Sequence, residues 1–254
     1  ALEPAFTAHG WKVARVNRSG SEGTISCDLS SAESVAAIPG EYDLVIHCAA
    51  SGGGGLESYR DVYLHGCRNL LARFPNSRFI FTSSTSVYPQ TDHSKVTESS
   101  AADPEAPRAR ILREAEDAVL ASNGIVARLS GLYGPGRCHV RKNFLAGSAT
   151  LDGKGERIMN FVHRDDVAQA LVLLADVGDA GEIYNVNGGY ATQRAVYQSL
   201  SEHYDLPFPP SADADAPRKR GNTSKEVISD KLKQLGWCPQ YTDFLSLALA
   251  CVVE

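Results

Sequence analysis

The sequence lacks the features that mark several special classes of protein. Its six cysteines form no CxxC pair and no spacing typical of metal ligands, so we predict no metal site. No apolar run approaches the roughly 20 residues that a transmembrane helix needs. The net charge of −5 disfavours a protein that must neutralise nucleic-acid phosphates. We therefore expect neither a membrane nor a nucleic acid as a partner.

The sequence does not begin with methionine, and Ala1 opens directly into a pattern typical of a helix. Leu2, Ala5 and Phe6 supply apolar positions of this helix, and Gly10 is a typical residue just after a helix C-terminus. We expect that a segment in front of Ala1 is absent from this sequence.

The composition that remains is ordinary for a globular protein. The chain has 254 residues, of which 43% are hydrophobic and 22% are charged, enough for one large domain or two small ones. Its cysteines lie in mostly apolar surroundings, which favours buried free thiols in a reducing compartment. We predict a soluble, cytoplasmic protein. The cysteines are Cys27, Cys48, Cys67, Cys138, Cys238 and Cys251.

From Trp11 onward, short apolar runs alternate with helical patterns. The alternation predicts a parallel sheet with helical crossovers, and the right-handed crossover rule makes this a doubly wound α/β fold of the Rossmann type. A smaller C-terminal substrate lobe is expected over the strand ends, with ligand between the two. Strands are predicted at 11–16, 23–27, 42–48, 78–81, 125–129 and 183–186, and helices at 31–37, 59–74, 108–121 and from His163.

The stretch RFIFTSSTSVY at residues 78–88 joins an apolar run to five consecutive hydroxyl side chains. Phe79, Ile80 and Phe81 suit a strand that is buried on both faces, as in a parallel sheet covered by helices. The hydroxyls from Thr82 onward then fall at the carboxyl end of the strand, where open α/β sheets bind their ligands. The alternative is a strand that runs into an ordinary polar loop, since short apolar runs are ambiguous.

Eight short motifs follow one another along the chain. They are Asp28 at a strand end, YDLVIHCAA (42–50), HGCRNLL (65–71), FTSSTSVY (81–88), ARLSGLYGPG (127–136), NFVHRDDVAQA (160–170), EIYNVNGG (182–189) and LKQLGWCP (232–239). In this order and spacing, the sequence resembles the extended short-chain dehydrogenases/reductases of the NAD-dependent epimerase/dehydratase type. The resemblance runs from Trp11 to about Pro239.

The resemblance implies a dinucleotide-binding Rossmann domain over residues 1–132, to which residues 160–186 return, and a mainly substrate-binding lobe over residues 133–254. The family begins with a strand and a GxxGxxG loop that holds the cofactor pyrophosphate at a helix N-terminus. No such loop occurs here, which again indicates a missing segment in front of Ala1. The glycines at residues 52–55 are not a substitute; a plain mobile loop is the favoured interpretation.

Arg18 lies just past the second strand of the family pattern, where the adenine ribose is recognised. An acid there favours a free 2′-hydroxyl and a base favours a 2′-phosphate. Asn17, Arg18 and Ser19 offer a cation and two hydrogen-bonding groups and no acid, so we expect NADP, with NAD the less favoured cofactor. A solvated surface arginine is the alternative. The resemblance also assigns to the cofactor Asp28, Leu29, Cys48, Ala49, Ala50 and Ser83.

Ser84 aligns with the family's catalytic Ser/Thr, four positions before Tyr88, and is expected to hydrogen-bond the reacting oxygen of the substrate. The family's acid/base pair, YxxxK, should fall at residues 108 and 112 or one residue later. The stretch RARILREAE (108–116) contains neither Tyr nor Lys. The usual acid/base machinery is therefore not carried over.

Four residues are candidates for a substitute proton donor: Tyr63, Tyr88, Tyr133 and His163. Tyr63 occupies the position of the Asn that usually completes the family's tetrad. Tyr88 lies closest to the expected reacting centre and is our catalytic candidate beside Ser84, although its family counterpart is mostly structural. His163 at the junction of the two lobes is more readily interpreted as structural.

A basic loop follows the strand at residues 125–129, where the family binds its substrate. Four potential cations within six residues of an acidic chain indicate a small anionic substrate, such as a sugar nucleotide or a phosphate. A solvated basic loop is the alternative. The four are Arg137, His139, Arg141 and Lys142. The residues that we assign to the substrate are Ser84, Tyr133, Arg137, His139 and Arg141.

Two functions remain open. The first is an NADP-dependent oxidoreductase, epimerase or dehydratase with an atypical active site, which transfers hydride between nicotinamide C4 and a substrate carbon. The second is a non-catalytic protein that senses the cofactor or partners another enzyme. By analogy with the family, a homodimer through the helices at 59–74 and 108–121 is also expected.

Overall fold

The computed structural model describes residues 1–21, 23–212 and 223–243. The chain forms two compact units, each of which combines segments that are distant in the sequence. The first unit comprises residues 1–87, 101–128 and 168–184, and the second comprises residues 88–100, 129–167 and 185–254. The domain boundaries inferred from the sequence stay a prediction. Cys251 lies outside the described residues.

A parallel sheet in the order β3-β4-β6-β9 forms the centre of the first unit. β3 and β4 pair in parallel, with His47 opposite Phe81. β6 and β9 are also parallel, because the hydrogen bonds Val126 N–H to Glu182 O and Ser130 N–H to Val186 O advance in the same direction along both strands. The expected parallel α/β fold is confirmed. The strands are β3 (Leu44–His47), β4 (Arg78–Ser84), β6 (Ile125–Leu129) and β9 (Ile183–Val186).

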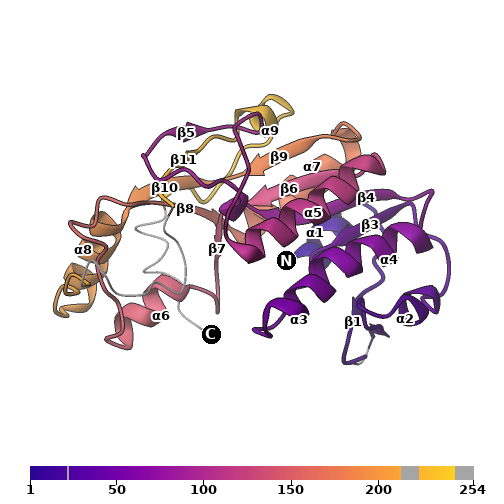
Figure 1. Ribbon diagram of the computed structural model, residues 1–254, viewed down its shortest axis with the longest axis horizontal. Coiled ribbons are helices and arrows are strands. Elements are labelled where there is room, and N and C mark those ends of the chain that lie inside the picture. Colours follow the sequence, from indigo (N-terminus) through magenta and orange to yellow (C-terminus); the bar gives the residue numbers. More distant parts are fainter. Residues whose placement is uncertain (22, 213–222, 244–254) are drawn as a thin grey trace. The chain divides into compact units, whose positions relative to one another are not determined.

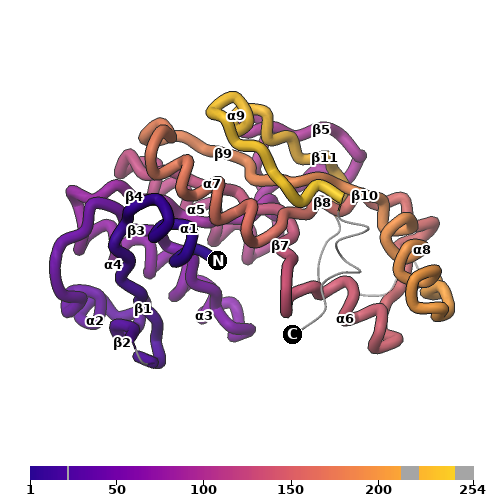
Figure 2. Tube along the Cα trace, turned by 180° about the vertical axis from the view of Figure 1, so that it is seen from behind, coloured from indigo at the N-terminus to yellow at the C-terminus, as the bar shows by residue number. Residues whose placement is uncertain are grey.

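Helices cover both faces of this sheet. The chain from α3 through a π-helical turn to α4 lies beside α5 on one face (Figure 1), and α1 and most of α7 lie on the opposite face, in front in the view from behind (Figure 2). The helices are α1 (Leu2–Ala8), α2 (Ala32–Ala36), α3 (Leu56–Arg60), the π-helical turn (Asp61–His65), α4 (Gly66–Arg73), α5 (Pro107–Ala121) and α7 (Arg164–Val177).

Local sequence explains several of these boundaries. The Ser31 hydroxyl caps α2 by accepting a hydrogen bond from the Ser34 N–H. Pro107 opens α5, where its missing N–H is not needed. Gly10 follows α1 with φ = +83°, a left-handed conformation that glycine adopts without strain. The buried face of α5 carries Ile111, Leu112, Ala115 and Val119 at helical spacing.

A separate two-stranded parallel sheet joins β1 (Val16–Asn17) to β2 (Ile25–Ser26). We expected a strand over residues 11–16, but the paired part begins only at Val16. Val13 and Val16 are both exposed in the described structure, at 39% and 40%. The apolar residues of this stretch thus have a strand-like pattern, but Val13 and Val16 are not buried.

The second unit contains strands that we did not predict. β8 pairs in parallel with β7 and antiparallel with β10, and β5 pairs in parallel with β11. β5, β7, β10 and β11 have two to four residues each, too few to show a periodicity of two. The elements are β5 (Lys95–Val96), β7 (Gly131–Tyr133), α6 (His139–Leu145), β8 (Ile158–His163), β10 (Gly189–Thr192), α8 (Gln193–Tyr204), β11 (Glu226–Val227) and α9 (Asp230–Gln234).

The cysteines only partly follow the sequence prediction. The five in the described residues are free, as predicted, and Cys27 and Cys67 are buried. The expectation of burial is wrong for Cys48 and Cys238, which are exposed. Cys48 follows the end of β3, where the chain leaves the covered sheet. Among the described helices, none combines the length and apolar character needed to cross a membrane.

Candidate functional site

The carboxyl end of β4 carries two neighbouring serines that point in opposite directions, as alternation along a strand requires. Ser84 is partly exposed, and its Oγ accepts a hydrogen bond from the Ser86 N–H at 3.2 Å. Ser83 is buried, with 5% of its surface exposed. The chain then makes a single 3₁₀ turn at Thr85–Val87. Of the two serines, Ser84 presents its hydroxyl at the carboxyl edge of the sheet.

Ser83 belongs to a buried ionic cluster centred on Glu116 of α5. The Ser83 hydroxyl donates to Glu116 Oε1 at 2.6 Å. Arg128 of β6 donates from Nε to Oε1 at 3.0 Å and from Nη2 to Oε2 at 2.7 Å. Glu116 is fully buried and Arg128 is 1% exposed. This two-pronged contact offsets the large desolvation cost of burying both charges.

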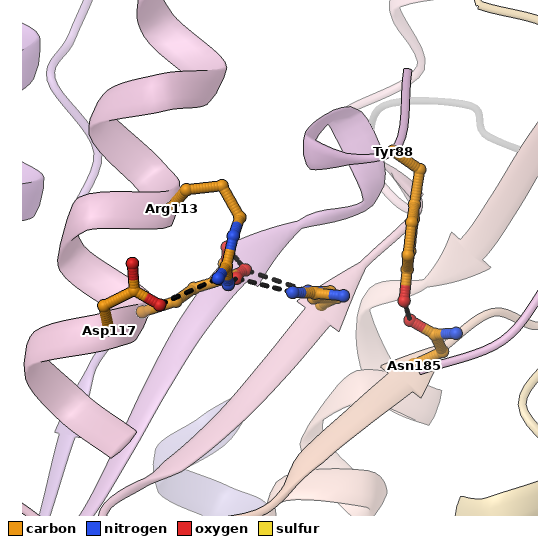
Figure 3. Close-up of polar contacts among 7 residues, drawn as sticks. Tyr88, Arg113, Asp117 and Asn185 are labelled. Carbon is orange, nitrogen blue, oxygen red and sulfur yellow. Dashed lines mark hydrogen bonds and ion pairs between the residues drawn. The ribbon is translucent and has the colours of Figure 1, made fainter. Parts of the chain in front are cut away.

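Arg113 extends the cluster along α5 toward the solvent. It contacts Glu116 and donates from Nη2 to Asp117 Oδ1 at 2.8 Å. Spacings of three and four residues place these side chains on one face of the helix, and Figure 3 shows Arg113 and Asp117 reaching toward each other. We call Ser83, Arg113, Glu116, Asp117 and Arg128 the Glu116 cluster. The cluster links α5, β4 and β6 within the first unit.

One residue of the Glu116 cluster, Ser83, was also predicted to contact the cofactor. The hydroxyl proton of Ser83 is held by Glu116, so the backbone of Ser83 is the part left to serve a cofactor. The assignment stays a prediction. The cluster could not be predicted from the sequence, because charged side chains are usually exposed unless the fold brings them a partner.

His47 lies buried at the end of β3, a residue that sequence reasoning did not single out. Its Nε2 is 2.8 Å from the Val62 carbonyl oxygen, and its Nδ1 is 3.4 Å from the Ala49 N. These contacts fit a neutral ring that donates from Nε2 and accepts at Nδ1, and burial lowers the pKa of His47. The adjoining Cys48, Ala49 and Ala50 are exposed. Because β3 and β4 are parallel neighbours, these three residues and Ser84 share one sheet edge.

Aromatic rings gather over the ends of β3 and β4. The Tyr63 ring lies 6.4 Å from the His47 ring at an interplanar angle of 7°, and 6.4 Å from the Phe81 ring at 64°. The Tyr59 and Tyr63 rings are 4.4 Å apart. Arg108, in the first turn of α5, places its Cζ 5.6 Å from the Tyr59 ring centroid. We call these five residues the Tyr63 cluster.

The residues predicted to meet the adenine ribose surround the turn after β1. The Asn17 side-chain oxygen accepts hydrogen bonds from the Gly20 N–H at 2.8 Å and the Ser19 hydroxyl at 3.1 Å, so Asn17 and Ser19 close the turn. Arg18 is exposed and makes no side-chain hydrogen bond or ion pair within the described part of the chain. Hydrogen bonds from Ser30 hold the pKa of Asp28 below its usual value, and the nearby Arg18 charge lowers it further.

Leu29, the other predicted adenine contact, is half-buried. Its carbonyl oxygen accepts a hydrogen bond from the Asn69 side chain at 2.8 Å. The structure therefore brings Arg18, Asp28 and Leu29 into one neighbourhood of the first unit. Their contact with a cofactor stays a prediction.

In the second unit, Tyr88 is fully buried, and its hydroxyl donates to Asn185 Oδ1 at 2.8 Å, a contact visible in Figure 3. The Lys225 ammonium donates to the Tyr88 carbonyl oxygen at 2.7 Å. Lys225 is only 4% exposed, and burial lowers its pKa to about 8. The polar sequence around Lys225 gave no sign that this side chain is buried.

Tyr133 and His163 pack with Tyr241 in the second unit. The Tyr133 hydroxyl donates to the Tyr241 carbonyl oxygen at 3.0 Å, and the His163 and Tyr241 rings stack 3.8 Å apart. The Asp166 carboxylate accepts hydrogen bonds from the backbone N–H groups of Gln240 and Tyr241 at 2.8 and 3.0 Å. Burial lowers the pKa of His163, against the raising effect of Asp165 and Asp166. These contacts give Tyr133 and His163 structural partners.

The predicted substrate cations differ in their surroundings. Arg137 and His139 are exposed. Arg141 is partly buried, and its Nε donates to the Tyr204 hydroxyl at 2.6 Å while its Cζ lies 5.5 Å from the Tyr204 ring. Arg137 and His139 are thus presented to solvent, whereas Arg141 is held on α8. Their role toward a substrate stays a prediction.

The family of the chain follows from its match to a family model. Residues 1–187 match the NAD dependent epimerase/dehydratase family. The chain belongs to this family. The expected resemblance is therefore confirmed over residues 1–187, about three quarters of the chain.

The chain is also similar to individual proteins. Protein YeeZ of Escherichia coli K12 is 41% identical over 112 residues, which are 43% of this chain and 39% of YeeZ, so the match spans well under two thirds of that relative. DesIV of Streptomyces venezuelae, a dTDP-glucose 4,6-dehydratase solved with NAD and TYD, superposes with a TM-score of 0.75 at 24% identity, over 88% of this chain and 76% of DesIV.

A UDP-glucose 4-epimerase of Thermotoga maritima, solved with UDP-glucose, superposes with a TM-score of 0.79 at 20% identity, over 98% of this chain and 93% of that chain. At such identities the two solved structures show the shared fold and no more.

Replacing Glu116 by Gln is expected to destabilise the protein strongly. Arg128 would be left buried without its counter-charge, which typically costs about 3–5 kcal/mol. The midpoint of urea unfolding measures the change. Glu114→Gln is the matched control, because Glu114 pairs with Arg60 at 46% exposure and such exposed pairs contribute about 0–1 kcal/mol. Equal losses in the two variants would contradict the role given to the Glu116 cluster.

Lys225 is expected to leave a signature in the pH dependence of stability. Between pH 8 and about 10.4 the unfolded chain keeps a proton that native Lys225 has released, so this site raises stability as pH rises. Below pH 8 both states are protonated, and the site contributes no slope. Lys225→Met should remove this rise, whereas Lys95→Met, at a side chain 72% exposed, should keep it. Parallel curves for Lys225→Met and the unaltered protein would refute the assignment.

Proposed function

We propose that this protein is an NADP-dependent oxidoreductase of the epimerase/dehydratase type, with an atypical active site and a small anionic, sugar-nucleotide-like substrate. The observation that carries the proposal is the hydroxyl of Ser84, partly exposed at the carboxyl end of β4. In α/β sheets of this kind, ligands bind at the carboxyl ends of the strands. Membership of the NAD dependent epimerase/dehydratase family supports the same chemistry.

The surroundings of Arg18 favour NADP. Its guanidinium is exposed in the turn after β1, and Asn17 and Ser19 beside it carry no negative charge. A cation at this position suits a 2′-phosphate, for which planar, two-pronged donors are well shaped. DesIV was solved with NAD, which supports a nicotinamide cofactor without deciding between the two forms. The residues present at the β1 turn fit the phosphorylated form.

The reaction requires a bound nicotinamide, which donates or accepts the hydride. The role of the protein is to hold the substrate carbon and its oxygen in place, and Ser84 is positioned to hydrogen-bond that oxygen. The family's acid/base pair is absent, since α5 (Pro107–Ala121) contains neither Tyr nor Lys. The proton must therefore come from a different side chain.

The proposed class of substrate, a small anion, is inferred from exposed basic side chains. Arg137 and His139 are exposed on the loop and helix that follow β7, and a cationic surface on an acidic chain attracts anions. DesIV was solved with TYD and the Thermotoga maritima epimerase with UDP-glucose. Both ligands carry phosphate groups, which suits the same kind of surface here.

The second candidate is a non-catalytic protein that binds the cofactor as a sensor or as the partner of an enzyme. The absence of Tyr and Lys from α5 is the observation that favours it. The two candidates share cofactor binding and differ in turnover, so experiments on Arg18 and on Ser84 address different parts of the proposal.

Arg18→Ala is expected to weaken NADPH binding about tenfold or more, since a hydrogen bond to a charged group contributes about 1.5–3 kcal/mol. NADH binding should change little, because NADH lacks the 2′-phosphate. Nicotinamide fluorescence during titration of full-length protein measures both. Arg15→Ala is the control, as Arg15 is also exposed but pairs with Glu3. Tighter binding of NADH than NADPH by the unaltered protein would overturn the NADP assignment.

Ser84→Ala is expected to lower turnover by about 10²–10³-fold, as when a donor to the reacting oxygen is removed. The assay follows product formation from UDP-glucose and dTDP-glucose by chromatography, because an epimerase or dehydratase takes and returns the same hydride and leaves no net change in nicotinamide absorbance. Ser86→Ala is the control, since Ser86 is exposed and only its backbone N–H contacts Ser84. Unchanged rates in Ser84→Ala would show that the end of β4 is not the active site.

A further inference from the structure

We propose that Tyr63 supplies the proton-donating hydroxyl that α5 lacks, with Arg108 as the cation that assists it. The inference rests on the proposed function and names a catalytic residue for it. When a substrate carbonyl is reduced, a bound reduced nicotinamide would supply the hydride that adds to the carbon. The Tyr63 O–H bond then breaks, its proton forms the new bond to the carbonyl oxygen, and a phenolate remains. In the reverse direction, the phenolate accepts the proton of the substrate hydroxyl as hydride leaves for the oxidised nicotinamide.

The first argument is the place of Tyr63 in the helix. It lies in the π-helical turn Asp61–His65 between α3 and α4, and such turns frequently occur at functional sites. The neighbouring Val62 carbonyl is held by His47 Nε2 at 2.8 Å. This contact fixes the turn to the end of β3 and with it the direction of the Tyr63 side chain, which is partly exposed.

The second argument is the part of the sheet that Tyr63 covers. Its ring contacts those of His47 and Phe81, the last hydrogen-bonded pair of β3 and β4. Ser84 lies three residues beyond Phe81 on the same strand. A tyrosine held against two buried rings is rigid, and a proton donor must be held rigidly to act in the transition state. Tyr63 therefore lies at the same sheet edge as the substrate-orienting serine.

The third argument is the cation beside the aromatic pair. The Arg108 Cζ lies 5.6 Å from the Tyr59 ring, and the Tyr59 and Tyr63 rings are 4.4 Å apart. A positive charge near a phenol favours its ionised form, which is the service that the family's Lys gives its Tyr. Arg108 also occupies one of the two positions at which the sequence pattern places the family's Tyr. Arg108 thus provides a cation at a position where the family's Tyr is expected, and the Tyr63 ring belongs to the same cluster.

The other candidate donors have structural partners. Tyr88 is fully buried and donates its hydroxyl proton to Asn185. Tyr133 donates to the Tyr241 carbonyl oxygen, and the His163 ring stacks on the Tyr241 ring at 3.8 Å. Of the four tyrosine and histidine candidates, Tyr63 is the one whose ring packs against His47 and Phe81 at the ends of β3 and β4.

Other charges around Tyr63 are largely paired with one another. Arg60 is bonded to Glu114 and His65 to Asp61. His47 faces the Tyr63 ring, and burial lowers its pKa. The titratable and charged groups on the surrounding elements are His47 on β3, Glu57 and Arg60 on α3, Asp61 and His65 on the π-helical turn, and Arg108, Arg113, Glu114 and Asp117 on α5.

Tyr63→Phe tests the inference, because it removes the hydroxyl and keeps the ring contacts that stabilise the fold. We expect turnover of UDP-glucose or dTDP-glucose to fall about 10²–10⁴-fold, the usual contribution of a general acid, with NADPH affinity unchanged. The pH limb of kcat that belongs to the phenol should vanish in Tyr63→Phe. In Arg108→Ala it should move to higher pH, and in Arg108→Lys it should stay near its original place.

Tyr42→Phe is the matched control, since Tyr42 precedes the amino end of β3 and its hydroxyl donates to the Pro39 carbonyl oxygen at 3.0 Å, so this variant is expected to keep the full rate and pH profile. If the unaltered protein turns over and Tyr63→Phe keeps its rate and pH profile, the inference is overturned while the proposed function stands. If the unaltered protein binds NADPH without any turnover, or binds no nicotinamide cofactor, the proposed function fails first and the inference fails with it.

Discussion

The buried carboxylate of Glu116 is the interaction on which the rest of the first unit depends. It receives the guanidinium of Arg128 from β6 and the hydroxyl of Ser83 from β4 while its own backbone belongs to α5. Charges without solvent are tolerated only when their partners are in place. The cluster therefore fixes how α5 lies over β4 and β6, and so where Arg108 at the start of α5 lies relative to Ser84 at the end of β4.

The two neighbouring serines at the end of β4 point to opposite faces of the sheet. Ser83 points inward and is bound by Glu116, whereas the side chain of Ser84 leaves the opposite face and stays partly exposed. Because side chains alternate along the strand, a register shift of one residue would exchange the surroundings of Ser83 and Ser84. The ion pair that stabilises the sheet thereby also sets the direction of the Ser84 hydroxyl, for which we propose a role in orienting the substrate.

Much of the fold was predictable from the sequence, and the reasons are local. β6 and β9 were predicted to the residue and α5 to within one, because each carries a buried apolar run or stripe with clear turn signals at its ends. β5 and β11 have two residues each and are defined only by their pairing with each other. The burial of Glu116, His47 and Lys225 could not be predicted either. The local sequence does not indicate which partner a charged or titratable residue will meet in the fold.

The departures from the family pattern are more informative than the matches. Tyr63 occupies the position of an amide in the family, and Arg108, 45 residues later, occupies one of the two positions expected for the family's Tyr. The fold brings both into one cluster through Tyr59. Independent loss of catalytic residues would leave unrelated side chains at the two positions. In the role proposed above, Tyr63 supplies the phenol of the family's acid and Arg108 supplies its cation. The proposal thereby predicts an enzyme rather than a sensor, because binding a cofactor requires neither part.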